Sequence, residues 1–165
     1  MLYIKYYNFL MGISLRYCHS REEAEDVLLI GFYRIYKNIE KYNGKGSFEN
    51  WMKRIVVNAA IDNYRKNKKY YHHDDIYELE NLPDESEPMP ENVPIEEIRK
   101  AVNDLSPGYR VVFNLYCFEG YQHGEIAEML GITESTSKSQ LRKARLSLRK
   151  KLEELNLNYM ERGEQ

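Results

Sequence analysis

Cationic side chains recur every three or four residues near the C-terminal end of the chain, and a second set of small or apolar side chains keeps the same spacing between them. The cationic set is Lys138, Arg142, Arg145 and Arg149. The small or apolar set is Ser137, Leu141, Ala144, Leu148 and Leu152. Because a helix brings residues three and four apart onto one side, this pattern predicts a helix with a buried face and a cationic face. A row of exposed cations binds phosphate.

The residues before this helix predict a tight turn that follows a shorter helix. Gly131 comes after Leu130, where a helix often ends in a left-handed residue, and the Thr133 hydroxyl is placed to cap the next helix. A short helix, a glycine turn and a basic helix together indicate a helix-turn-helix, which lays its second helix in the major groove of DNA.

The position of each polar residue along the second helix predicts what it contacts. Residues near its N-terminus enter the groove deepest and are candidates for base edges. These candidates are Ser135, Lys138, Ser139 and Arg142. The later cations are expected to hold phosphates, which gives affinity without sequence information. They are Lys143, Arg145, Arg149 and Lys150.

A second candidate nucleic-acid site lies in the first half of the chain, where a loop with two glycines precedes a basic helix. Its loop residues are Asn43, Lys45, Ser47 and Phe48, and its helix residues are Lys53, Arg54, Asn58, Arg65 and Lys66. Cations track a single-stranded backbone, and a loop pocket holds an unstacked base.

Three features of this helix favour purely structural roles. Trp51, Ile55 and Ala59 are spaced by four residues, which predicts that Trp51 is buried in the core. Asn58 and Asp62 are also four apart and could bond to each other, and Arg65 could form an ion pair with Asp62. Base stacking is therefore assigned to the loop rather than to Trp51.

The charge is sorted along the 165 residues although the net charge is only −2. Residues 1–70 hold thirteen Lys or Arg and seven Asp or Glu, a net charge of +6. Residues 71–94 hold eight acidic residues and no Lys or Arg, a net charge of −8. Two basic lobes around an acidic connector fit two nucleic-acid contacts, although three differently charged solvated faces would give the same totals.

The cysteines and the hydropathy exclude several classes of protein. Cys18 and Cys117 are far apart and lack metal-ligand spacing, so we expect reduced, mostly buried thiols. No apolar run approaches the ~20 residues of a membrane helix, and no cationic leader precedes one. We therefore expect a cytoplasmic protein without membrane insertion.

Breakers and hydrophobic spacing predict an all-α fold, with two small helical domains joined by a flexible acidic linker. The expected helices cover about 3–17, 20–39, 48–69, 95–105 and 109–118, followed by the helix-turn-helix. The apolar positions of the second helix are Ala24, Val27, Leu28, Phe32, Ile35 and Ile39. The expected domains are residues 1–70 and 95–155, with the linker at 71–94 and a polar, frayed tail at 156–165 that begins near Leu157.

Residues in both lobes resemble the extracytoplasmic-function group of bacterial RNA polymerase sigma factors, over about residues 3–153. In the first lobe the matching residues are Ala24-Glu25-Asp26 with Phe32, then Phe48-x-x-Trp51-Met52-x-x-Ile55-x-x-Asn58-x-x-x-Asp62-x-x-Arg65. In the second they are Leu105-Ser106-Pro107-x-x-Arg110, Glu125-Ile126-Ala127, Leu130-Gly131 and Thr136-Ser137-Lys138-Ser139-Gln140-Leu141-x-x-Ala144-Arg145.

The resemblance implies a protein that binds core RNA polymerase and directs it to promoters. The first lobe would bind the polymerase clamp helices and melt the minus-ten element, and the second would bind the minus-thirty-five element as duplex. Asn58 and the 42–48 loop would handle the non-template strand, while Lys53, Arg54, Arg65 and Lys66 hold its backbone. The implied polymerase-binding residues are Glu25, Asp26, Leu29, Ile30 and Tyr33. An anti-sigma partner would suit an exposed apolar patch from Leu28 to Ile30. The resemblance implies no catalytic residue, metal, cofactor or small-molecule substrate.

Three departures from the family pattern carry expectations of their own. Leu29-Ile30-Gly31 stands where the family usually has a Gln and an acidic residue facing polymerase, so this contact is more apolar or polymerase binding is weaker. The chain starts a turn or two of helix late, which suggests a truncated N-terminus. Tyr121-Gln122-His123-Gly124 replaces the usual Ser or Thr cap, which should loosen the following helix by about 1 kcal/mol.

Two other functions fit parts of the sequence. A stand-alone helix-turn-helix regulator would use the first lobe for dimerisation or sensing, although such a lobe has no need for Lys53, Arg54, Asn58 and Arg65 together. An enzyme would use His72-His73-Asp74-Asp75 as a metal cluster. Adjacent ligands without a partner at helical spacing make a poor preorganised site, so a solvated linker start is the better interpretation.

Overall fold

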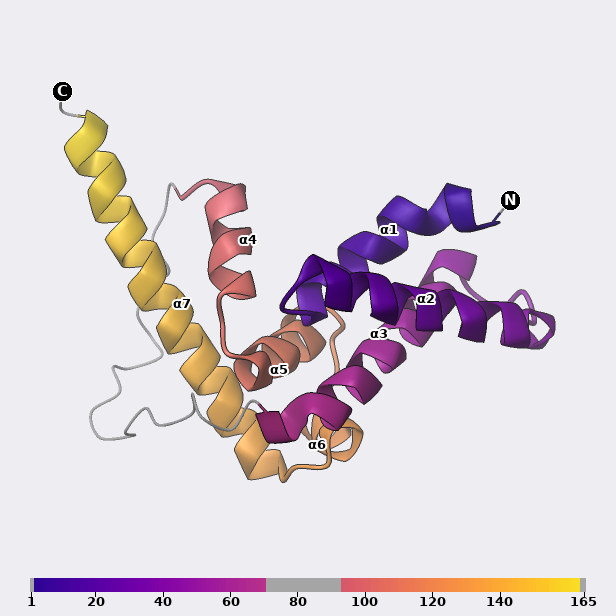
Figure 1. Ribbon diagram of the computed structural model, residues 1–165. Helices are drawn as coiled ribbons and strands as arrows, with labels where there is room; N and C mark the ends of the chain where they lie inside the picture. The colour runs from indigo at the N-terminus through magenta and orange to yellow at the C-terminus, as the bar shows by residue number, and fades with distance from the viewer. Residues whose placement is uncertain (1, 71–92, 164–165) are drawn as a thin grey trace. The chain divides into compact units, whose positions relative to one another are not determined.

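The fold is known from a computed structural model that describes residues 2–70 and 93–163, with side chains described for 2–69 and 93–155. The chain divides into two compact units, Met1–Tyr70 and Tyr71–Gln165. Within the described residues the regular structure is helical, which confirms the all-α expectation (Figure 1). The predicted linker at 71–94, apart from Val93 and Pro94, and the His72-His73-Asp74-Asp75 stretch lie outside the described residues.

The first unit is built from three helices that pack against one another in pairs. They are α1 (Leu2–Tyr17), α2 (Arg21–Asn38) and α3 (Phe48–Asn67), with short 3-10 helices at Ile39–Lys41 and Lys68–Tyr70. Ser20 caps α2 by accepting a hydrogen bond from the Glu23 amide. The Glu23 carboxylate accepts in turn from the amide of His19. Ser47 caps α3 by accepting from the Asn50 amide.

The core of the first unit contains five of the six apolar positions predicted for α2. Ala24, Val27, Leu28, Phe32 and Ile35 are all buried. Ile39 is 42% exposed, so its predicted place in the core is wrong. The reason is that α2 ends at Asn38, and the 3-10 turn that follows breaks the helical register.

Helices α2 and α3 approach each other closely at Gly31. A Cβ placed on Gly31 would lie 2.8 Å from Cγ2 of Val56, which is fully buried. Real side chains do not tolerate this separation, so the glycine is required by packing. Gly12 differs, because a Cβ at that position on α1 would meet nothing within 4 Å.

The second unit contains α4 (Ile95–Asn103), α5 (Pro107–Cys117), α6 (His123–Leu130) and α7 (Glu134–Gly163). A helix to Gly163 contradicts the expected frayed tail after Leu157. Pro107 occupies the first turn of α5, where a proline needs no amide hydrogen, and it separates α5 from α4. The buried Arg110 ties the two together by donating a hydrogen bond to the Asn103 carbonyl at 2.6 Å.

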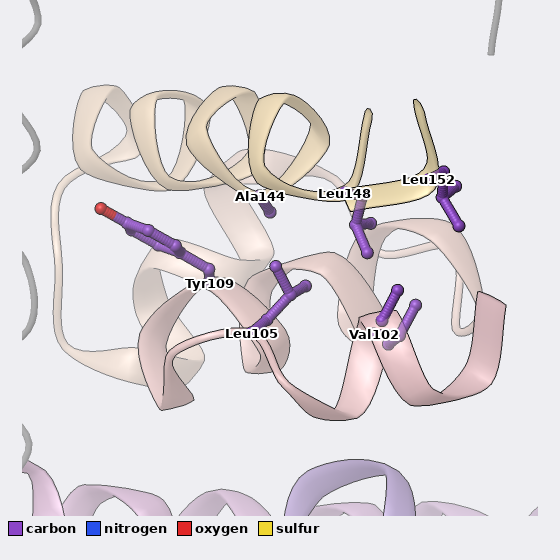
Figure 2. Packing of buried hydrophobic residues seen from close by; sticks show 7 residues of the cluster. Val102, Leu105, Tyr109, Ala144, Leu148 and Leu152 are labelled. Carbon is purple, nitrogen blue, oxygen red and sulfur yellow. The ribbon is translucent and has the colours of Figure 1, made fainter. Parts of the chain in front are cut away.

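The core of this unit forms where α7 lies against α4 and α5. Figure 2 shows Ala144, Leu148 and Leu152 pointing from α7 toward Val102 and Leu105. Lys151 of α7 also pairs with Asp104 just after α4. The α7 backbone is therefore held from one side along several turns.

The two cysteines differ in their surroundings. Cys18 is buried, as expected, whereas Cys117 at the end of α5 is exposed, so the prediction of two buried thiols is wrong for Cys117. It lies beside Arg145, and partial burial raises the pKa of its thiol.

Candidate nucleic-acid interface

The second unit contains the predicted helix-turn-helix, formed by α6, a three-residue turn and α7. Gly131 ends α6 in the left-handed region with φ 61°. Its amide hydrogen-bonds back to carbonyls of the last turn of α6. The Thr133 hydroxyl accepts from the Thr136 amide at 3.0 Å, which confirms the predicted cap of α7.

The start of α6 differs from the expectation that its cap is lost. The Glu125 carboxylate accepts a hydrogen bond from the Gln122 amide at 2.7 Å, and the two residues form a capping box. The expected loosening of this helix by about 1 kcal/mol is therefore not supported, because Gln122 takes the place of the usual Ser or Thr.

The two faces of α7 are separated as the spacing predicts. The predicted buried stripe from Ser137 to Leu152 is 4% exposed or less at each of its five positions. Lys138, Arg142 and Arg145 are exposed, while Arg149 is half-buried. Since the stripe is fixed against the core, the cations lie on a surface whose orientation is set by packing.

Of the other candidate DNA-binding residues on α7, two are exposed and two are half-buried. Ser135 and Lys150 are exposed, and Ser139 and Lys143 are half-buried. The Lys143 ammonium lies over the Tyr109 ring at 5.9 Å, so this cation also covers the core. Lys138 pairs with Glu134 at 2.6 Å, an ion pair that the sequence reasoning did not include.

A contact around His123 was also missed by the sequence reasoning. The His123 ring stacks on Tyr116 of α5 with ring centroids 4.7 Å apart, and its Nδ1 lies 2.9 Å from Ser137 Oγ. Burial is the main cause that lowers the pKa of His123, followed by the nearby Lys138 cation. Its partners are seven and fourteen residues away, so no local spacing indicated the contact.

In the first unit, the predicted 42–47 loop is closed by its own hydrogen bonds. The Tyr42 hydroxyl donates to the Gly46 carbonyl at 2.8 Å, and the Lys45 amide donates to Asn43 Oδ1 at 3.0 Å. Gly44 and Gly46 have φ of 74° and 81°, a conformation that other residues rarely adopt. The loop therefore has a defined shape that depends on both glycines.

Four aromatic rings gather where this loop joins α3. Phe48 and Trp51 stack with centroids 5.5 Å apart and planes inclined by 18°. Tyr42 contacts both, and Tyr6 of α1 meets Phe48 edge-on. Trp51 is half-buried in this loop aromatic cluster, so its predicted burial in the core is wrong. It lies in the first turn of α3, where neighbouring loop rings cover it only in part.

The candidate polar residues of α3 follow this cluster along the helix, toward its C-terminal end. Arg54, Asn58, Arg65 and Lys66 are exposed and Lys53 is half-buried. Arg54, Asn58 and Arg65 share one helical face by their spacing of four and seven. Asp62 binds Arg34 of α2 at 2.7 Å, in place of the alternatives that pair it with Asn58 or Arg65.

The outer surface of α2 carries the five predicted polymerase-binding residues, all of them exposed. Leu29 is 66% exposed and Tyr33 61% exposed, and Ile30 is also in contact with solvent. Tyr36 is 75% exposed and extends the same surface, although the sequence reasoning omitted it. We call Leu29, Ile30, Tyr33 and Tyr36 the apolar surface of α2.

The described part of the chain contains neither a metal-binding cluster nor a membrane-spanning helix. Across residues 2–70 and 93–163, no group of three or more His, Cys, Asp or Glu residues is arranged to hold a metal ion. Among the same residues, no helix has both the length and the apolarity to cross a bilayer.

Comparison with protein families matches both units. The family model described as Sigma-70 region 2 matches residues 2–70, and the one described as Sigma-70, region 4 matches residues 95–148.

The chain is also similar to individual proteins. It is 31% identical to the ECF RNA polymerase sigma factor SigW of Bacillus subtilis, over 81% of this chain and 77% of that protein. It is 28% identical to the RNA polymerase sigma factor YlaC of the same organism, over 92% and 90%. A crystal structure of the sigma factor RpoE with the anti-sigma factor NepR from Bartonella quintana has a similar fold. That likeness has a TM-score of 0.54 and 18% identity, and it covers 92% of this chain and 94% of the other.

Proposed function

We propose that this chain, which belongs to the extracytoplasmic-function group of RNA polymerase sigma factors, reads the minus-thirty-five promoter element with α7 and opens the minus-ten element with its first unit. As a member of that family, the protein binds core RNA polymerase and promoter DNA and directs promoter-specific transcription initiation. It is a transcription initiation factor.

The observation that carries the proposal is the separation of the two faces of α7. Its apolar stripe is anchored in the core, and its early polar residues stand on the outer side. Ser135, Lys138, Ser139 and Arg142 then meet base edges in the major groove, with Lys and Arg suited to guanine. Lys143, Arg145, Arg149 and Lys150 bind phosphate oxygens.

In the first unit, the closed loop and the loop aromatic cluster support a role with melted DNA. The rings of the cluster are half-buried, and a ring face left open to solvent can stack only on a base that has left the duplex. The loop residues 42–48 and Asn58 would hold the non-template strand, and Lys53, Arg54, Arg65 and Lys66 would track its phosphates. The exposure of Arg54, Asn58 and Arg65 along one face supports this division.

The outer surface of α2 is proposed as the contact with core polymerase. It includes Glu25, Asp26, Leu29, Ile30 and Tyr33, all of them exposed, and because the family usually has polar residues in place of Leu29 and Ile30, this contact does not depend on apolar side chains at those two positions. An anti-sigma factor that covers the same surface would compete with polymerase. The sequence pattern predicts an exposed patch from Leu28 to Ile30, but Leu28 is buried and takes no part in this contact.

Transcription in vitro with purified core polymerase tests the proposal. The holoenzyme formed from core polymerase and this protein first selects promoter fragments from random-sequence duplexes. Adding the protein to core polymerase should then produce transcripts from the selected fragments and not from the other duplexes. Arg142→Ala should reduce this promoter-dependent transcription while Glu153→Ala, an exposed change further along α7, leaves it intact. Polymerase that gains no promoter preference would refute the proposal.

A footprint on duplex DNA without polymerase would favour the stand-alone regulator instead. The proposal also places the protein in the cytoplasm, with core polymerase, and leaves the chemistry of RNA synthesis to that enzyme. Stoichiometric metal in the purified protein would revive the enzyme hypothesis.

A further inference from the structure

His123 joins three helices of the second unit through one side chain. It is the first residue of α6, and its imidazole lies against Tyr116 of α5 at 4.7 Å with the planes inclined by 22°. Its Nδ1 is 2.9 Å from Ser137 Oγ on α7. The two helices of the helix-turn-helix are therefore linked directly to each other, and both are linked to α5.

The Ser137 end of this link lies in a dry environment. Ser137 is fully buried and lies at the end of the first turn of α7, between the base-reading candidates Ser135 and Ser139. Pulling a buried hydroxyl away from its partner costs about 1–3 kcal/mol, so the contact resists a rotation or shift of α7 relative to α6.

The Tyr116 end reaches α7 a second time. The Arg145 guanidinium lies over the Tyr116 ring, 5.8 Å from its centroid. Arg145 follows Ser137 by eight residues, which is about two turns of helix. The His123–Tyr116 stack thus touches α7 at two points on the part of the helix that carries its candidate DNA contacts.

The charges around His123 come from α7. Lys138 and Arg145 disfavour an imidazolium, Glu134 favours it, and burial has the largest effect and opposes the charge. Tyr116 packs on the ring from α5. The lowered pKa of His123 means that the neutral ring predominates near neutral pH.

We propose that His123 is a positioning residue for promoter recognition, which sets the register and angle of α7 against the minus-thirty-five duplex through its contacts with Ser137 and Tyr116. The inference rests on the proposed role of α7. It adds a residue that need not touch DNA and that acts through the helix that does. Loss of the contact should weaken discrimination between sequences more than general affinity for DNA.

The test measures how much transcription depends on the minus-thirty-five element. Holoenzyme is reconstituted from core polymerase and the full chain, and a promoter is selected from random-sequence duplexes with the wild-type holoenzyme. The readout is the ratio of transcripts from this promoter to those from the same promoter with the minus-thirty-five element scrambled. We expect His123→Ala to lower the ratio about tenfold, as displaced base contacts should.

A double-mutant cycle isolates the hydrogen bond. His123→Phe keeps a ring against Tyr116 but loses Nδ1, and Ser137→Ala removes the hydroxyl from the other side. Each change should lower the ratio about threefold, and the double variant should lower it no further. Additive effects of the two changes would overturn the proposed link.

Val102→Ala serves as the matched control, because Val102 is buried against α7 in the same unit and has no part in the His123 contact. It should destabilise the unit and leave the ratio unchanged as long as the protein is folded. Equal loss in Val102→Ala and His123→Ala would overturn the inference by showing a purely structural role. A ratio near one for the wild type would refute the proposed role of α7 and the inference with it. A high wild-type ratio that persists in His123→Ala would refute only the inference.

Discussion

Gly31→Ala is the substitution whose cost follows most directly from the structure. The new Cβ would stand 2.8 Å from Cγ2 of Val56 and 3.6 Å from its Cα. Val56 is fully buried and β-branched, so its side chain has few other rotamers to adopt. Relief requires α2 and α3 to move apart, and overpacking of this kind costs about 1–3 kcal/mol.

The substitution also brings a gain, because alanine in a helix is about 1 kcal/mol better than glycine. Gly12→Ala measures that gain alone, since Gly12 lies in α1 with open space around it. We expect Gly12→Ala to stabilise the first unit and Gly31→Ala to destabilise it. The free energies of unfolding of the two variants should differ by about 1–3 kcal/mol, because the helix-propensity contribution cancels in the comparison.

Urea denaturation followed by tryptophan fluorescence is the appropriate assay. Trp51 is the single tryptophan of the sequence and lies in the first unit, so its emission reports on that unit alone. With a dependence of about 1 kcal/mol per molar urea, the midpoints of the two variants should differ by about 1–3 M. In a Val56→Ala background the difference should shrink. Equal midpoints for Gly12→Ala and Gly31→Ala would refute the packing argument.

Three further predictions concern function and pH. Arg142→Ala should lower transcription from the selected promoter about tenfold and relax the sequence preference of the holoenzyme. Arg145→Ala should instead weaken binding to all duplexes and reduce the salt dependence of that binding, which titrations at several ionic strengths would reveal. The double change Leu29→Gln and Ile30→Glu should leave transcription equal or higher, because it restores polar residues usual in the family; complete loss in the same assay would identify the apolar pair as the interface itself. The stability of the second unit should fall as the pH drops below about 6.5, because the folded state disfavours a charged His123 and the unfolded state does not. In thermal unfolding measured at several pH values, His123→Asn should reduce the dependence of the melting temperature on pH in this range. An unchanged dependence would contradict the assignment.

Helical spacing was sufficient to predict α7 because the spacing and the type of its side chains are both local properties of the sequence. A stripe at three and four residues defines a face, and only one face of α7 carried side chains suited to a core. The same reasoning failed at Trp51 and Ile39. Spacing identifies a face but does not say which neighbour covers it, or whether the helix continues far enough to keep the residue on that face. Trp51 meets loop rings, and Ile39 follows the end of α2.

For the apolar surface of α2, the sequence and the structure each supply a different part of the argument. The sequence identified Leu29 and Ile30 as departures from the family pattern, and the structure gives their exposure. Gly31, in the same departure, has a different explanation, because the contact with Val56 leaves no space for a side chain. Adjacent residues of one motif thus have different roles: Leu29 and Ile30 form a solvent-exposed surface, and Gly31 allows the close packing of α2 against α3.

The two proposed DNA sites suit two different forms of DNA, an intact duplex and a melted strand. On α7 the cations extend from a helix anchored along several turns, which suits a duplex whose groove has a fixed shape. At the start of α3, aromatic rings and a hydrogen-bonded glycine loop lie at the surface, and cations follow on one face. Ring faces have no partner in stacked duplex DNA but bind unpaired bases, so removing a ring should impair opening more than duplex binding. Phe48→Ala should therefore slow transcription from a duplex promoter and have a smaller effect on a template whose minus-ten region is already mismatched. An equal loss on both templates would assign the ring to holding the strand once it is open, and no loss on either would remove the loop aromatic cluster from the proposed site.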